Sequence, residues 1–142
     1  MKIQNNIRNI LYRSPLSLIT LATIIYLSLF YKSDKPVTTI EYADKIVHFL
    51  MYAGLCVMLW FEYMCSHKRL NYKNITLGAV VLPIVFSGVL EIAQSTITQT
   101  RKGDIYDFLF NTLGALSAVI FSLYVSKPII RKYNLYKKHI KE

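Results

Sequence analysis

Four long runs of apolar residues, separated by short polar segments, dominate the sequence. About 20 helical residues are needed to cross the roughly 30 Å hydrocarbon core of a bilayer, and each run approaches this length. The runs are continuous rather than alternating, which excludes the strands of a membrane β-barrel and leaves the α-helix. The pattern predicts an all-α, polytopic bundle of four transmembrane helices at about residues 15–31, 40–64, 75–97 and 105–125.

Local signals refine the ends of these helices. Thr38 and Glu41 have the spacing of a capping box, so the second helix should begin outside the hydrocarbon. Asp104 is expected to be the N-cap of the fourth helix. Pro83 and Gly88 predict a kink in the third helix, because proline removes a backbone donor. The first run lacks a small-residue cleavage site at its end, so it is interpreted as a retained signal anchor.

The distribution of basic residues predicts how the helices are oriented. The chain carries 17 Lys and Arg against 8 Asp and Glu, and 54% of its residues are hydrophobic. Three basic residues lie in the N-terminal segment, three in the loop between helices two and three, and six in the tail at 127–142, against five in the other two loops. The positive-inside rule therefore places both termini in the cytoplasm. Because no basic face of a soluble domain is formed, a nucleic-acid partner is not expected.

The chain is expected to form one membrane domain over residues 1–142, since no repeat or long linker divides it. Cys56 and Cys65 lie nine positions apart on one predicted helix, which separates their Cα atoms by about 13 Å. That distance is too large for a disulfide. The two thiols are therefore interpreted as packing residues.

Polar residues recur at helical spacing near the outer ends of three helices, where each set forms a stripe. The stripes are Asp44, Lys45, His48 and Tyr52 on the second helix, Glu91, Gln94 and Thr98 on the third, and Asp104, Asp107, Asn111 and Gly114 on the fourth. A charged group near the centre of a membrane costs at least about 2.5–3.5 kcal/mol, so such groups should face the bundle interior. The coincidence of three stripes at one depth predicts an outward-facing polar site.

Glu91 is the clearest member of this site, because it lies about 9 Å inside the outer end of its helix. It should have a partner at that depth, and the candidates are Arg101, Lys45 and His48, with Gln94 and Asn111 as neutral alternatives. A purely structural role remains open for the set, with Asp104 and Asp107 serving the helix N-terminus. The small residues from Gly114 to Ala118 predict a close helix-packing seam.

The order and spacing of these residues resemble the VanZ-like membrane proteins of bacteria. The matching segments are residues 44–52, 91–94 and 101–114, with the pattern D-K-x-x-H-F-x-x-Y, E-x-x-Q and R-x-x-D-x-x-D-x-x-x-N-x-x-G. The resemblance implies a multi-pass protein of the bacterial cytoplasmic membrane that belongs to the cell envelope. The namesake of the family is an accessory factor in resistance to the glycopeptide antibiotic teicoplanin. The resemblance thus implies a location and a context but no reaction.

Three functions are compatible with the sequence. The favoured one is binding or processing of a lipid-linked or amphiphilic envelope molecule at the outer leaflet, with Lys45, Arg101 and Lys102 as donors to an anion. The second is an enzyme acting on a lipid headgroup, with general acid or base chemistry by candidate catalytic residues and with a divalent cation as a conceivable cofactor. Those candidates are His48, Glu91 and Asp107. The third is a structural network that pins the helices; a homo-oligomer is left open.

Overall fold

The computed structural model of the chain describes residues 14–29, 43–67, 70–97 and 104–139. Within these ranges all regular structure is helical and no strand occurs, as the apolar runs predict. The elements are α2 (Pro15–Leu29), α3 (Ala43–Ser66), α4 (Tyr72–Thr76), the π-helix η1 (Leu77–Val81), α5 (Leu82–Ile97), α6 (Ile105–Phe121), the π-helix η2 (Ser122–Ser126) and α7 (Lys127–His139).

In the described residues, three helices are long and apolar enough to cross a membrane: Ala43–Ser66, Tyr72–Thr96 and Ile105–Tyr133. The second of these joins α4, η1 and α5, and the third joins α6, η2 and the start of α7. The apolar helix α2 has 15 residues, about 22 Å at 1.5 Å per residue, which is less than the hydrocarbon thickness. Residues 30–42, which include Thr38, Glu41 and the predicted start of the second helix, lie outside the described ranges.

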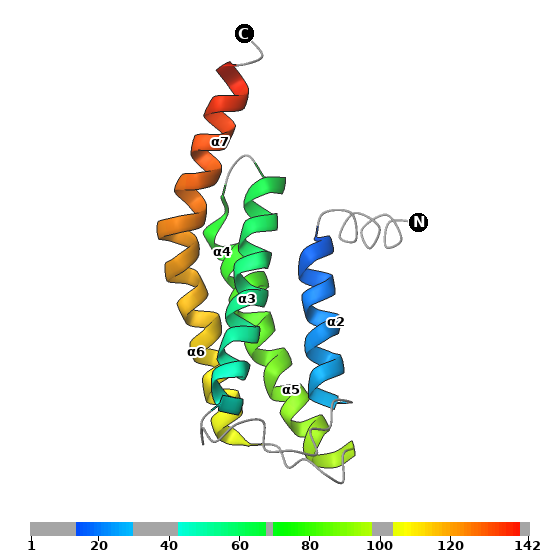
Figure 1. The fold of residues 1–142 in the computed structure, drawn as a ribbon. Helices are drawn as coiled ribbons and strands as arrows, with labels where there is room; N and C mark the ends of the chain where they lie inside the picture. The colour runs from blue at the N-terminus through cyan, green and yellow to red at the C-terminus, as the bar shows by residue number, and fades with distance from the viewer. Residues whose placement is uncertain (1–13, 30–42, 68–69, 98–103, 140–142) are drawn as a thin grey trace, which may run out of the picture.

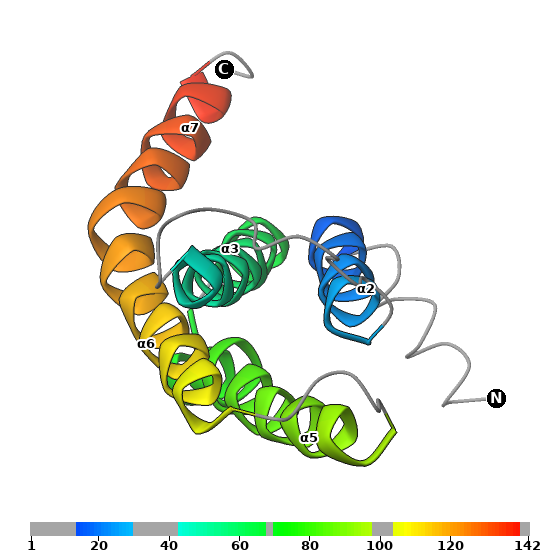
Figure 2. The same cartoon turned by 60° about the horizontal axis from the view of Figure 1, so that its bottom comes forward.

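The four described helical segments, namely α2, α3, α4 to α5, and α6 to α7, run in alternating directions (Figure 1). The ends of α2 and α5 and the starts of α3 and α6 lie at the lower end of the bundle, while α7 extends beyond the other helices at the upper end (Figure 1). Figure 2 shows α3 between α2 and α6, with α5 on the side of α6. The helix α3 packs on α2, on α5 and most extensively on α6, so it is the centre of the bundle.

Each π-helix ends two residues before a proline. In η1 the Leu82 amide donates to the Leu77 carbonyl, and Pro83 follows. In η2 the Lys127 amide donates to the Ser122 carbonyl, and Pro128 follows. A proline ring clashes with the carbonyl four residues earlier in a regular α-helix, and a wider turn relieves that clash. The disturbance predicted at Pro83 therefore takes the form of a π turn ahead of it.

The fourth helix was expected to end near Val125, but the structure continues it through η2 into α7 as far as His139. Most of the basic tail is consequently helical. The sequence prediction ended this helix where the apolar run ends, whereas the π turn lets the helix continue past Pro128. The third helix also begins earlier than expected, at Tyr72, because the Asn71 side chain caps it by accepting from the Asn74 amide.

The contact between α3 and α6 depends on the small residues that the sequence singled out as a seam. A Cβ added at Gly114 would lie 2.3 Å from the Phe49 carbonyl oxygen and 3.0 Å from the Ala53 amide nitrogen. Ala115 and Ala118 are 0% and 1% exposed and pack with Cys56. The backbone of α6 therefore lies directly against that of α3 at this point, and only glycine fits at position 114.

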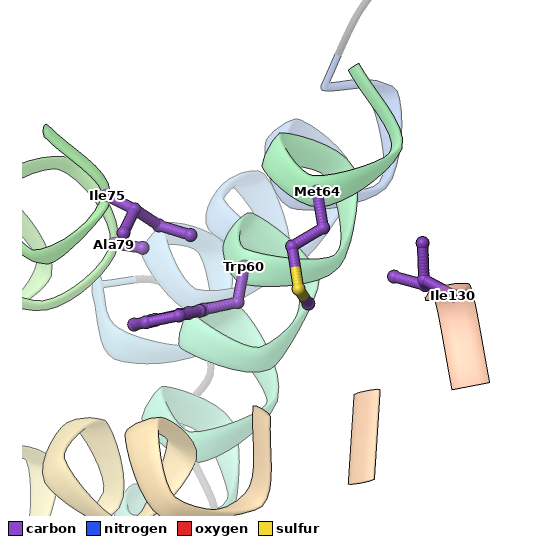
Figure 3. Close-up of a cluster of buried hydrophobic side chains, with 5 residues drawn as sticks. All are labelled: Trp60, Met64, Ile75, Ala79 and Ile130. Carbon is purple, nitrogen blue, oxygen red and sulfur yellow. The ribbon is translucent and has the colours of Figure 1, made fainter. Parts of the chain in front are cut away.

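Apolar clusters hold the remaining helices against α3. Figure 3 shows Trp60 and Met64 of α3 packed with Ile75 of α4, Ala79 of η1 and Ile130 of α7. This cluster ties the upper end of the bundle together and includes a residue of the basic helix α7. A second cluster joins α2 to α3 and α5, and consists of Ile24, Tyr52, Leu55 and Leu90.

A buried carboxylate of α3 fastens the start of α2. Glu62 is 6% exposed, and its Oε1 accepts from the Leu16 amide at 2.7 Å. The Ser17 amide lies 3.3 Å from Oε2, and the Ser17 hydroxyl donates to the same oxygen. These groups are the unpaired donors of a helix N-terminus, where a negative charge is also favoured by the helix dipole. Glu62 thus supplies from a neighbouring helix the cap that α2 needs.

Substituting Gly114 by Ala should destabilise the protein by at least about 1–3 kcal/mol, the usual cost of overpacking, because the new methyl group meets backbone rather than a movable side chain. The measurement is the free energy of unfolding in an SDS titration followed by circular dichroism. Gly54→Ala is the matched control, since a Cβ at Gly54 has no neighbour within 4 Å. Equal stabilities of the two variants would contradict the close approach.

Substituting Glu62 by Leu should lower the free energy of unfolding by about 1.5–3 kcal/mol or more, the contribution of a hydrogen bond to a charged group. Ser17→Ala should cost less, because the backbone amides of α2 keep their acceptor. The same SDS titration measures both. A Glu62→Leu variant as stable as the wild type would show that the start of α2 does not depend on this carboxylate.

Candidate functional site

The polar stripes meet at the end of the bundle where α3 and α6 begin, the lower end in Figure 1. The centre of the contact is Lys45 of α3, whose Nζ lies 2.9 Å from Asp104 Oδ2 and 3.1 Å from Asp107 Oδ1. The Lys45 and Asp107 side chains are 19% and 12% exposed. Because both partners are largely withdrawn from water, each needs the other, and removing one would strand a charge.

Asp104 has two further roles at the start of α6. Its Oδ1 accepts from the Tyr106 amide at 2.9 Å, which makes it the N-cap that the sequence predicts. The hydrogen bond from Lys45, supported by that from the Tyr106 amide, lowers the pKa of Asp104 below its usual value. The carboxylate is therefore charged at neutral pH and holds the Lys45 ammonium, which also lies 5.6 Å from the centroid of the Tyr106 ring.

A chain of hydrogen bonds continues from this ion pair into the buried interior. His48 Nδ1 lies 3.2 Å from Asn111 Oδ1, and Asn111 Nδ2 donates to Ser87 Oγ at 2.7 Å. These three residues come from α3, α6 and α5 and are 6%, 2% and 0% exposed. The Tyr52 hydroxyl, one turn further along α3, interacts with the same serine. The network thus links three helices through buried side chains.

The other nitrogen of His48 faces a carboxylate. His48 Nε2 lies 3.6 Å from Asp107 Oδ2. Asp44, one turn before His48 on α3, brings a carboxylate oxygen to the same place, and the three donor atoms all lie within 4.8 Å of one another. Asp44 is exposed, whereas His48 and Asp107 are buried. The three donors together could hold a metal ion, and they mark the point where the buried network reaches the surface of the bundle.

Glu91 lies at the edge of this network. Its Oε2 accepts from the Asp104 amide at 3.2 Å, so a backbone group at the start of α6 is a partner that sequence reasoning did not consider. Between described residues, no hydrogen bond or ion pair joins its side chain to Lys45, His48 or Asn111. The contact still places a carboxylate of α5 against the N-terminus of α6, where negative charge is favoured.

The other residues predicted to form the site either bond to different partners than expected or lie outside the described residues. Gln94 is 3% exposed, and its Nε2 donates to the Ser28 carbonyl of α2 at 2.9 Å, so it joins α5 to α2. Arg101, Lys102 and Thr98 lie outside the described residues. Lys45, expected to be a donor to an anionic ligand, is already held by two carboxylates. Among the described side chains, the site therefore offers negative rather than positive charge.

Sequence reasoning missed Ser87, the residue that connects Asn111 to α5. The signal was present, because Ser87, Glu91 and Gln94 stand at i, i+4 and i+7 and so continue the predicted stripe by one turn. A lone serine in an apolar run carries little information, since its hydroxyl can bond to its own helix. Only its position against α6 makes it part of the network.

This arrangement can bind a polar group and can exchange a proton with it. Exposed Asp44 and partly exposed Asp104 form the entrance, and His48 with Asp107 forms a buried imidazole–carboxylate pair behind them. Such a pair is a common means of general acid–base catalysis. The described residues of the network contain no cysteine, and its hydroxyls belong to Ser87 and Tyr52, which lie behind the histidine rather than at the entrance.

Comparison with known proteins gives one result that bears on this site. The model of the family described as VanZ/LLP1 matches residues 2–126, which includes α2 to α6, η2 and every residue of the network. No curated protein and no solved structure matches the chain.

Proposed function

The chain belongs to the VanZ/LLP1 family, and on that basis we propose that it crosses the bacterial cytoplasmic membrane four times, with both termini in the cytoplasm. The excess of Lys and Arg in the N-terminal segment, the loop after α3 and the C-terminal tail supports this orientation. The alternating directions of the helices support it as well, because they put these three segments toward the same end of the bundle (Figure 1). The polar network then lies toward the outer leaflet.

Cys65 offers a direct test of this orientation. It is exposed in the last turn of α3, whereas Cys56 is buried. In the proposed topology Cys65 lies on the cytoplasmic side of the membrane, which faces outward in inverted vesicles. A membrane-impermeant maleimide should therefore label the wild type in inverted vesicles and not in intact spheroplasts. In a Cys65→Ser background, Thr96→Cys at the opposite end of the bundle should show the reverse pattern. Labelling of Cys65 in spheroplasts would overturn the proposed topology.

The function that this geometry supports best is binding of the polar headgroup of a lipid-linked or amphiphilic envelope molecule. The observation that carries the proposal is the buried chain of hydrogen bonds from His48 through Asn111 to Ser87, whose histidine end lies within 4.8 Å of the exposed Asp44 carboxylate. A network meant only to pin helices has no need of an exposed end. An incoming headgroup with hydroxyl or amine groups would find oriented acceptors at that end.

The surfaces beside the entrance suit the apolar part of such a molecule. Large apolar side chains are exposed on all three helices near the network: Val47 and Leu50 on α3, Val89 and Ile92 on α5, and Ile105 and Leu109 on α6. An acyl or polyprenyl chain could lie on these faces while the headgroup enters the network. The link to teicoplanin resistance that the resemblance implies would, in this proposal, depend on the envelope molecule that is bound.

An enzyme acting on such a headgroup is the second candidate. The specific observation in its favour is the approach of His48 Nε2 to Asp107 Oδ2, at 3.6 Å, beside the exposed entrance. A histidine paired with a carboxylate can take and return a proton during hydrolysis or transfer. Turnover of a labelled envelope lipid by the purified protein would distinguish an enzyme from a binding protein.

Native mass spectrometry of the gently purified protein tests the binding proposal. The wild type should retain an amphiphile, and His48→Ala and Asp107→Asn should lose it by roughly ten- to hundredfold, the worth of a hydrogen bond to a charged group. Gly54→Ala, which alters a position away from the network, should retain it. If no protein retains an amphiphile and the two variants are merely less stable, the network is structural and the proposal fails.

A further inference from the structure

We propose that Asp44, His48 and Asp107 form a binding site for a divalent transition-metal ion, with Zn²⁺ the preferred ion. The two ligands from α3 stand at i and i+4, so both project from one face toward Asp107 of α6. Their donor atoms and that of Asp107 all lie within 4.8 Å of one another. As an account of what the polar site binds, the inference rests on the proposed function.

The spacing of two of the donors, His48 Nε2 and Asp107 Oδ2, is close to that in a zinc site. Ligand atoms of Zn²⁺ lie about 2.0–2.2 Å from the ion, so two ligands at a tetrahedral angle are roughly 3.4 Å apart. His48 Nε2 and Asp107 Oδ2 are 3.6 Å apart, which requires only a small adjustment. One imidazole and two carboxylates suit Zn²⁺ or Mn²⁺, and the order of intrinsic affinities favours Zn²⁺. Three protein ligands would leave a fourth coordination position for another ligand.

The orientation of His48 is independent evidence for a cation at this position. In the structure Asn111 donates its amide hydrogen to Ser87 and turns its oxygen to His48 Nδ1. An oxygen acceptor requires Nδ1 to carry the proton, so in the neutral ring the lone pair of Nε2 points toward Asp107. A cation placed between these two electron-rich atoms would be bound by both of them. Metal-binding histidines are characteristically held in this way, with the second nitrogen donating to an oxygen.

The two carboxylate oxygens of Asp107 have different partners, and this arrangement also favours a metal ion beside His48. Its Oδ1 is 3.1 Å from Lys45 Nζ, and its Oδ2 faces His48. Lys45 therefore orients the carboxylate from the side that a metal would not use. The Lys45 ammonium neutralises one of the carboxylate charges of Asp44, Asp104 and Asp107. One divalent ion would therefore bring the net charge of this group of side chains close to zero.

A metal ion would change which headgroups the site can take. The described side chains around the entrance include Asp44, Glu91, Asp104 and Asp107 but only one lysine. The carboxylates among these described side chains disfavour a phosphate, and Lys45 is already engaged. With Zn²⁺ in place, its open position supplies the Lewis-acidic centre that a phosphate or pyrophosphate oxygen requires. The substrate class indicated is therefore an amphiphile whose headgroup carries a phosphate.

The experiment is isothermal titration of Zn²⁺ into the full-length, chelator-treated protein in detergent, with bound metal quantified by mass spectrometry. The wild type should bind a single Zn²⁺ per chain. Asn111→Leu should weaken binding by about 10- to 100-fold, as outer-shell substitutions do, and His48→Ala should weaken it further. His67→Ala is the matched control, because His67 is an exposed histidine in the same chain, beyond the far end of α3.

A second variant separates metal binding from folding. Asp44 is exposed, so Asp44→Asn removes a ligand without disturbing the packed interior. It should weaken Zn²⁺ binding by at least about tenfold while the thermal unfolding of the metal-free protein is unchanged. Absence of Zn²⁺ from the wild type, or equal binding by wild type, Asp44→Asn and His48→Ala, would overturn the inference. In that case the contact between His48 and Asp107 belongs to the structural network alone.

Repeating the native mass spectrometry with and without chelator distinguishes this inference from the proposed function. Retention of a phosphate-bearing lipid only in the presence of Zn²⁺ supports both. Retention of an amphiphile regardless of chelator leaves the proposed function intact and removes the role given to the metal. Zn²⁺ binding without any retained amphiphile sustains the metal site and contradicts the proposed function.

Discussion

The close approach of α3 and α6 is the constraint on which the rest of the structure depends. At Gly114 the backbone of α6 lies against the Phe49 carbonyl of α3, a distance that no side chain would permit. Phe49 adjoins His48, and Gly114 lies one turn beyond Asn111. The seam therefore fixes the rotation of both helices and brings the imidazole against the amide at 3.2 Å. A wider separation would leave these buried groups without partners, at a cost of about 1–3 kcal/mol for each one.

The second theme is how polar groups are satisfied where water is scarce. Glu62 receives donors from the start of α2, Glu91 receives the amide at the start of α6, and Gln94 bonds to a carbonyl of α2. In two of these contacts a carboxylate meets a helix N-terminus, where free amides and the helix dipole both favour it. Among the described residues, only Trp60 Nε1 and Ser122 Oγ are buried side-chain atoms without a partner. Ser122 begins the π turn before Pro128, where regular backbone bonding is interrupted.

The charges of the described site residues differ from the anion-binding site that the sequence suggests. Lys45 stands beside polar residues at a helix end and so invites interpretation as an anion-binding group, yet the fold places it between Asp104 and Asp107. The site that was expected to bind an anion is therefore acidic in the described residues. His48 Nδ1 faces Asn111, and its Nε2 faces the Asp107 carboxylate. A cation that bridges these groups would reconcile the acidic site with a phosphate-bearing ligand.

The sequence by itself determined that the chain is helical, that Gly114 lies in a close packing seam and that polar residues gather near one end of three helices, because run length and helical spacing are local properties of the chain. It could not determine which stripe residues meet. Ser87 joins the network, Gln94 turns to α2 and Glu91 bonds to a backbone amide because of how α5 is rotated and packed, which no single helix encodes. The extension of the last helix past Pro128 was equally hidden, since a π turn cannot be read from hydropathy. The site is thus a property of three helices in contact, and only the tertiary structure assembles it.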